Sequence, residues 1–153
     1  MNSHQLTNPD DIKNFVMGGK AYFTLVSAAT GTRFTYRSFV ARDTPTRFFV
    51  GAMVGSDNNT AYSYLGVLED AATGINVRLT AKSKFDASET RVKALEYFIR
   101  NINSKVLPTN LEFWHEGRCG CCGRRLTVPA SIESGIGPEC ARKRAVDKQP
   151  MLV

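Results

Sequence analysis

Apolar and polar residues alternate with a period of two through much of the first half of the chain, the pattern typical of half-buried β-strands. Segments rich in Gly, Asn, Asp and Thr separate these runs and supply the turns. Short strands joined by tight turns indicate an antiparallel meander. The predicted strands cover residues 22–26, 33–40, 47–54, 62–68 and 75–80.

Two helices flank this run of strands. Asn8 offers an N-cap followed by Pro9 at the first helical position, and Gly18-Gly19 ends this short helix. The longer helix begins at the capping-box pair Asp86 and Glu89. Its apolar side chains recur at helical spacing along one face, namely Val92, Leu95, Phe98, Ile99 and Ile102. The fold class that we predict is α+β: an antiparallel meander sheet with one main packed helix, plus a small C-terminal zinc module ending in a helix.

The predicted organisation is a sheet-and-helix domain over residues 1–110, a zinc-binding module over 111–148 and a tail over 149–153. The chain length of 153 residues suits one core with a small appended module. The N-terminal residues lack a basic segment followed by an apolar run, and no stretch approaches the roughly 18 apolar residues that span a bilayer. We therefore expect a soluble, cytoplasmic protein that makes no membrane contact.

Aromatic residues recur on the predicted strands: Tyr22, Phe34, Tyr36, Phe48, Tyr62 and Tyr64. Exposed rings on a sheet are one means of stacking single-stranded bases. The sequence has no Arg-Gly-Phe signature of the RNA-binding sheet, so we interpret these rings as ordinary strand formers, half of them in the core. Tyrosines facing solvent beside Arg33, Arg37 and Arg78 would favour the stacking interpretation.

Positive charge is concentrated near the C-terminus. The formal net charge is +6, and residues 118–148 hold seven lysines and arginines against three acids. A basic patch attracts phosphate groups, although a modest one often serves solubility alone. The candidate nucleic-acid-binding residues of this region are Arg118, Arg124, Arg125, Arg142, Lys143 and Arg144.

The cysteines lie in the same region. Cys119 and Cys122 form a Cys-x-x-Cys pair, and Gly123 permits a left-handed backbone after the second thiol. Cys140 follows Pro138 and is expected in the first turn of a closing helix, where the helix dipole favours a thiolate. Because cytoplasmic thiols are kept reduced, this spacing predicts zinc ligands in preference to disulfides.

The spacing leaves the fourth zinc ligand open. His115 lies four residues before Cys119 and can supply a nitrogen, whereas Cys121 would complete an all-thiolate site. Side chains of adjacent cysteines diverge, which favours the histidine. The alternative for His115 is a structural role, bonded to a carbonyl beside Trp114. The predicted structural zinc site is therefore His115, Cys119, Cys122 and Cys140, with Cys121 as the alternative fourth ligand.

The cysteine motif resembles a short domain found in many uncharacterised proteins of bacteriophages and bacteria. The resemblance rests on Cys119-x-x-Cys122-Gly-Arg-Arg-Leu-Thr-x-Pro-x-Ser131 followed by Gly135-Ile-Gly-Pro-x-Cys140, and it covers roughly residues 113–144. It implies a small metal-binding module and a phage or mobile-element origin. It implies no activity, because the domain is one of unknown function. Cys121 stands where that family would have another residue.

The sequence argues against an enzyme. Histidine occurs twice, at His4 and His115, which leaves a nuclease or hydrolase almost nothing to use as a general base. His115-Glu116 fits neither the His-Glu-x-x-His motif nor the motif of the base deaminases. Gly135-Ile-Gly-Pro is too short for a phosphate loop.

Two functional classes remain. In the first, the protein contacts DNA or RNA, or a nucleoprotein complex, through its basic C-terminal module. In the second, it is a phage-encoded inhibitor that binds a host defence factor by protein–protein contacts, in the cytoplasm of the host cell. The local charge favours the first. The sequence indicates no oligomeric state.

Overall fold

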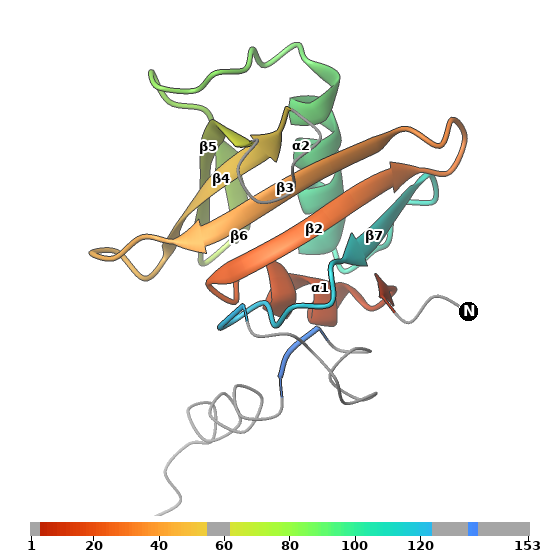
Figure 1. Ribbon diagram of the computed structural model, residues 1–153, viewed down its shortest axis with the longest axis horizontal. Coiled ribbons are helices and arrows are strands. Elements are labelled where there is room, and N and C mark those ends of the chain that lie inside the picture. The colour runs from red at the N-terminus through yellow and green to blue at the C-terminus, as the bar shows by residue number, and fades with distance from the viewer. Residues whose placement is uncertain (1–3, 55–61, 124–134, 138–153) are drawn as a thin grey trace, which may run out of the picture.

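The computed structural model describes residues 4–54, 62–123 and 135–137 of the chain. Within these ranges it contains seven strands and two helices (Figure 1). In chain order the elements are β1 (Gln5–Leu6), α1 (Pro9–Val16), β2 (Lys20–Ser27), β3 (Arg33–Val40), β4 (Arg47–Met53), β5 (Tyr62–Ala71), β6 (Gly74–Arg78), α2 (Thr90–Asn103) and β7 (Leu111–His115).

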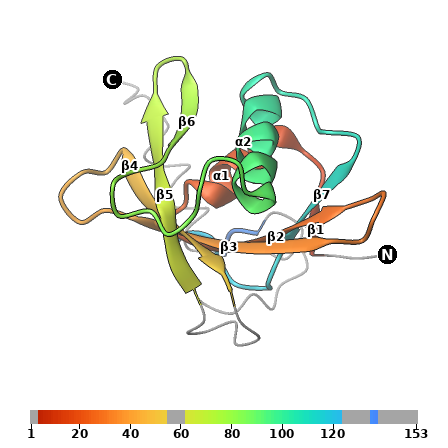
Figure 2. The same cartoon turned by 90° about the horizontal axis from the view of Figure 1, so that it is seen from above.

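The strands form one antiparallel sheet in the order β1-β7-β2-β3-β4-β5-β6. Neighbours from β2 to β6 are consecutive in sequence, so the predicted meander and the α+β class are confirmed. The sheet curls toward the side that carries the helices (Figure 2). The last strand, β7, was not predicted; it pairs with β2 on one side and with the short β1 on the other. The boundary predicted after residue 110 thus falls directly before a strand of the sheet.

Helix α1 begins as predicted. The Asn8 side chain accepts hydrogen bonds from the backbone N–H groups of Asp10 and Asp11, at 2.8 and 3.3 Å, and Pro9 takes the first helical position. The helix buries Ile12, Phe15 and Val16 beneath β2 and β7.

Helix α2 starts later than the capping box indicated. The Glu89 carboxylate accepts a hydrogen bond from the Asp86 N–H at 2.8 Å, which is one half of the predicted box, but the regular helix begins at Thr90. The five predicted apolar side chains are all buried against the sheet. The Asn103 side chain at the helix end donates to and accepts from the backbone of Ile75, so it occupies the outer edge of β6 as another strand would.

The core lies between α2 and one face of the sheet. Phe23, Phe98 and Phe113 stack there, with ring centroids 5.0 to 5.6 Å apart. Successive side chains on a strand point to opposite faces. The strand residues that alternate with these core residues therefore face away from the helices. Among the described residues, no helix is long and apolar enough to cross a membrane.

The predicted closing helix of the zinc module, with Cys140, falls outside the described residues. The predicted tail over 149–153 also lies outside them. What the structure describes of the module is the cysteine turn from Cys119 to Gly123 and the short segment 135–137.

Candidate metal centre

The cysteine turn packs directly on the junction between α1 and β2. The Lys20 N–H donates to the Gly120 carbonyl at 2.8 Å. A Cβ on Gly18 would overlap that same carbonyl, and one on Gly120 would come within 2.7 Å of the Phe15 carbonyl oxygen. Glycine is therefore needed on both sides of the contact, which fixes the turn to the sheet domain. The sequence marked Gly18 only as the end of a helix.

Within the turn, backbone groups converge on Cys119. The Gly123 N–H donates to the Cys119 carbonyl at 2.8 Å, and Gly123 has a φ of 76°, the left-handed conformation that the sequence predicted. The Cys121 N–H donates to the Cys119 Sγ at 3.3 Å. This tight loop is the form in which a Cys-x-x-Cys pair presents thiolates to one metal ion.

The second half of the motif meets the first at the same sulfur. The Gly120 N–H donates to the Gly135 carbonyl at 2.9 Å, and the Gly137 N–H donates to the Cys119 Sγ at 3.2 Å. Ile136 is buried against Cys119. Cys119 is therefore enclosed by backbone from both halves of the motif, and residue 137 lies three positions before Cys140 in sequence.

The surroundings of Cys119 favour the thiolate. A side-chain hydrogen bond from Cys121 is the largest cause, and the N–H groups of Gly137, Cys122 and Cys121 add to it. Burial acts in the opposite sense, yet together these contacts lower the pKa of Cys119 from 9.0 to about 4. The thiolate is the form of cysteine that binds metals.

His115 lies at the end of β7, buried on the core side of the sheet. Its Nδ1 accepts a hydrogen bond from the Gly117 N–H at 2.9 Å, its ring stacks on His4 at 4.9 Å, and Phe15 lies 5.6 Å away. A neutral imidazole whose Nδ1 accepts a hydrogen bond carries its proton on Nε2. A protonated nitrogen has no lone pair for a metal, so this arrangement suits a packed histidine better than a ligand. Nothing in the sequence indicated the contact between His115 and His4.

The remaining candidate residues that the structure describes do not gather at one point. Cys121 is half-buried beside Cys119, whereas Cys122 is exposed. In the part of the chain that the structure describes, no three His, Cys, Asp or Glu side chains are grouped closely enough to hold a metal ion. Arg118 is exposed, with its guanidinium carbon 5.9 Å from the ring centroid of Tyr22. Several predicted site residues lie outside the described ranges: Arg124, Arg125, Cys140, Arg142, Lys143 and Arg144.

One known protein family matches this region of the chain. Residues 110–145 match DUF6011, a family of unknown function. The match covers less than a quarter of the 153 residues and includes β7 and both halves of the cysteine motif. The predicted resemblance to an uncharacterised family is thus confirmed, while metal binding and a phage origin stay predictions. No curated protein and no solved structure matches the chain.

Proposed function

We propose that this protein is a non-enzymatic, zinc-stabilised protein that contacts nucleic acid through its basic C-terminal segment. One observation carries the metal part. Both halves of the motif converge on the Cys119 sulfur, which accepts hydrogen bonds from the N–H groups of Cys121 and Gly137. Such N–H to sulfur bonds stabilise a thiolate and orient it for a metal. The non-enzymatic part rests on the scarcity of histidine.

The proposed ligands are Cys119, Cys122 and Cys140, with Cys121 as the fourth. Cys121 is preferred to His115, against the divergence expected of adjacent cysteines, because the hydrogen bond at His115 Nδ1 leaves the proton on Nε2, whereas the Cys121 side chain already reaches Cys119. Four cysteines form a closed structural site without an open position for a substrate. Bound zinc would cross-link the turn to the segment that follows residue 137.

The nucleic-acid part is supported by the charge of the sequence around this site. The cysteine turn is held on the sheet domain, so it is a rigid base for the basic residues on either side of it. Arg118 precedes the turn and is exposed. The proposed phosphate contacts are Arg118, Arg124, Arg125, Arg142, Lys143 and Arg144.

Metal content tests the zinc part. Elemental analysis of protein purified under reducing conditions should give about one zinc ion per chain. Cys119→Ser and Cys121→Ser should lower the content, whereas His115→Gln, which keeps a polar side chain at this buried position, should retain it. Loss of zinc in His115→Gln with retention in Cys121→Ser would show that His115, not Cys121, is the fourth ligand. No metal in any folded, reduced sample would overturn the site.

Salt dependence tests the nucleic-acid part. Binding to a labelled oligonucleotide, followed by fluorescence anisotropy, should weaken steeply with added salt. The double variant Arg124→Ala/Arg125→Ala should reduce the slope of log affinity against log salt by about one to two. A matched control is Lys82→Ala/Lys84→Ala, which removes two charges from the loop before α2. Equal effects of the two double variants would contradict a contact specific to the C-terminal segment.

A further inference from the structure

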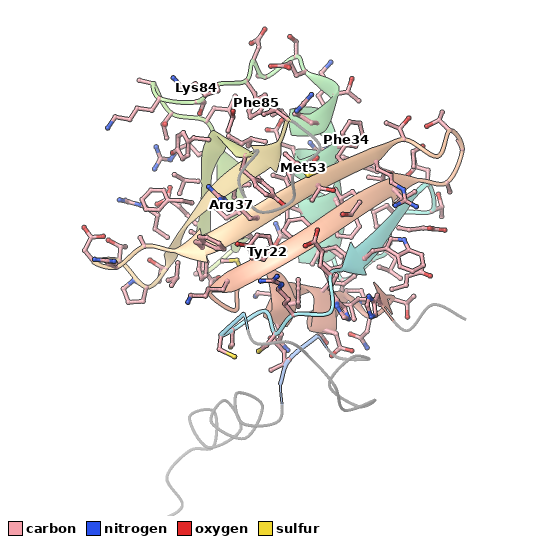
Figure 3. All side chains as sticks on the ribbon, in the orientation of Figure 1. Tyr22, Phe34, Arg37, Met53, Lys84 and Phe85 are labelled. Atoms are coloured by element: carbon pink, nitrogen blue, oxygen red, sulfur yellow. The ribbon has the colours of Figure 1, made fainter. Side chains whose placement is uncertain are left out.

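The sheet face turned away from the helices carries a cluster of rings and guanidinium groups, which we call the aromatic–arginine face. The strand registers place its members on β2 to β5, with Arg118 following β7. Figure 3 shows Tyr22 and Arg37 on this face, opposite α2. Its residues are Tyr22, Arg37, Phe39, Phe49, Tyr62 and Arg118.

Arg37 lies at the centre of this face between two rings. Its guanidinium carbon is 4.8 Å from the ring centroid of Tyr62 and 5.3 Å from that of Phe39. Gly51 on the neighbouring strand makes room, because a Cβ there would come within 3.3 Å of the Arg37 Nε. Glycine in the middle of a strand commonly marks such a close approach. The planar guanidinium is therefore held in place by stacking.

The other members extend the cluster in both directions. Tyr22 packs edge-on against Phe39 and Tyr62, with centroids 5.5 and 6.1 Å apart, and Arg118 lies over Tyr22. Phe49 is 45% exposed, a high value for a phenylalanine on an inner strand of a sheet. Rings and cations thus alternate across adjacent strands, where a core face would have aliphatic residues.

The charges on this face are open to an anion. Among the residues that the structure describes, neither Arg37 nor Arg118 forms an ion pair with a carboxylate. Arg118 is the less open of the two cations, because Glu116 lies nearby: burial raises the pKa of that carboxyl and the Arg118 charge lowers it. The nearby acid Glu69 already pairs with Arg47 and Arg78. The Tyr62 hydroxyl is buried and has no hydrogen-bond partner in the described part of the chain. Planar guanidinium groups without a carboxylate partner suit the oxygens of a phosphate.

We propose that the aromatic–arginine face binds single-stranded nucleic acid. Unpaired bases stack on the exposed Phe49 ring and on the half-buried Tyr22 ring, while Arg37 and Arg118 contact the phosphates between them. A duplex keeps its bases paired and stacked, so it cannot offer their flat surfaces to a sheet. This inference rests on the proposed nucleic-acid binding, to which it adds the form of the ligand and a second surface.

Anisotropy titrations with a labelled deoxythymidine oligonucleotide of about 20 nucleotides, alone and annealed to its complement, test this inference. Wild type should prefer the single strand. Phe49→Ala and Arg37→Ala should each weaken single-strand binding by about tenfold. The matched controls are Tyr97→Ala and Arg100→Ala on α2, an aromatic and a cation on the other side of the sheet; they should change it less than about twofold. Phe49 is exposed enough for its removal to spare the fold, and Arg118→Ala, also exposed, serves as a second charge variant.

The outcomes separate the two proposals. Equal affinity for single strand and duplex would overturn the inference alone. Single-strand binding that falls with Arg124→Ala/Arg125→Ala but is unchanged in Phe49→Ala and Arg37→Ala would do the same and leave the proposed function standing. No binding of either form by wild type at low salt would overturn both.

Discussion

Tyr36 and Tyr62 lie on opposite faces of the same sheet, and their surroundings differ. The Tyr36 ring stacks on Phe23 in the core, and its hydroxyl donates to the Arg91 carbonyl at 2.6 Å. The Tyr62 ring lies against the Arg37 guanidinium, and its hydroxyl has no hydrogen-bond partner among the described residues. The Tyr36 hydroxyl is thus satisfied and the Tyr62 hydroxyl is not; among the described residues the core face also buries one hydroxyl without a partner, that of Ser38. The two hydroxyl groups therefore report on opposite faces of the sheet.

Truncating one phenylalanine on each face should give the largest difference. Phe113 packs against Phe15, Phe23 and Phe98, so Phe113→Ala should lower the free energy of unfolding by about 3–5 kcal/mol. Phe49→Ala should cost less than about 1 kcal/mol because that ring is already exposed. Urea denaturation measures both values. Similar losses would mean that Phe49 is part of the stabilising core, which would remove the contrast between the faces.

Removing one hydroxyl group from each face gives a smaller difference. Tyr36→Phe leaves the Arg91 carbonyl without its donor and should cost about 1 kcal/mol. Tyr62→Phe removes a buried hydroxyl with no partner, so stability should stay within about 0.5 kcal/mol or rise. Thermal unfolding under matched conditions compares the two. A greater loss in Tyr62→Phe would show that its hydroxyl is bonded in solution.

Alkaline titration extends the same comparison. Burial is the main cause that raises the pKa of Tyr62 from 10.0 to about 12, with the Glu116 charge next, and burial raises the pKa of Tyr36 further still. The folded protein thus keeps both phenols protonated where an unfolded chain would lose the protons. Their contribution to stability is complete below pH 10 and declines as the pH rises through 12. Tyrosinate absorbance should show Tyr62 ionising before Tyr36, and the step near pH 12 should lose one tyrosine in Tyr62→Phe. A step near pH 12 that is unchanged in Tyr62→Phe would assign it to another tyrosine.

Neutralising an acid beside the outer face should have the smallest effect. Glu116 raises the pKa of Tyr62 through its charge, which places its carboxylate near the aromatic–arginine face. Such a charge opposes a polyanion, so Glu116→Gln should tighten single-strand binding by about twofold at low salt. Glu96→Gln on α2 is the matched control. Weaker binding in Glu116→Gln would instead indicate that the carboxylate accepts a hydrogen bond from a base.

Local pattern predicted much of this fold. The alternation along β2 to β6 and the Asn8-Pro9 start of α1 are decided within a few residues, so sequence alone located them. The place of β7 between β1 and β2 could not be predicted, because its partner β2 lies far away in sequence and such pairing leaves no local signal. Even so, Leu111, Phe113 and His115 alternate with polar or exposed-face residues, a period of two that would have indicated a strand.

The candidate site was predicted unevenly. Spacing alone indicated the left-handed Gly123, because a tight turn after Cys-x-x-Cys requires it. The six strand aromatics divide between the two faces of the sheet. Tyr36 and Phe48 are buried in the core, and Phe34 packs against it, whereas Tyr22, Tyr62 and Tyr64 face outward. Composition could not separate these groups, since the register with neighbouring strands decides which way each ring points.

The fluorescence of Trp114 reports on binding of single-stranded nucleic acid to the outer face of the sheet. It is the single tryptophan of the chain, and it pairs with Thr24 on the outward-facing side of the sheet. Adding the single-stranded deoxythymidine oligonucleotide at low salt should quench its emission saturably, and added salt should restore it. The annealed duplex should quench far less. Emission that stays unchanged while anisotropy shows the oligonucleotide fully bound would place the ligand elsewhere and refute binding at the outer face.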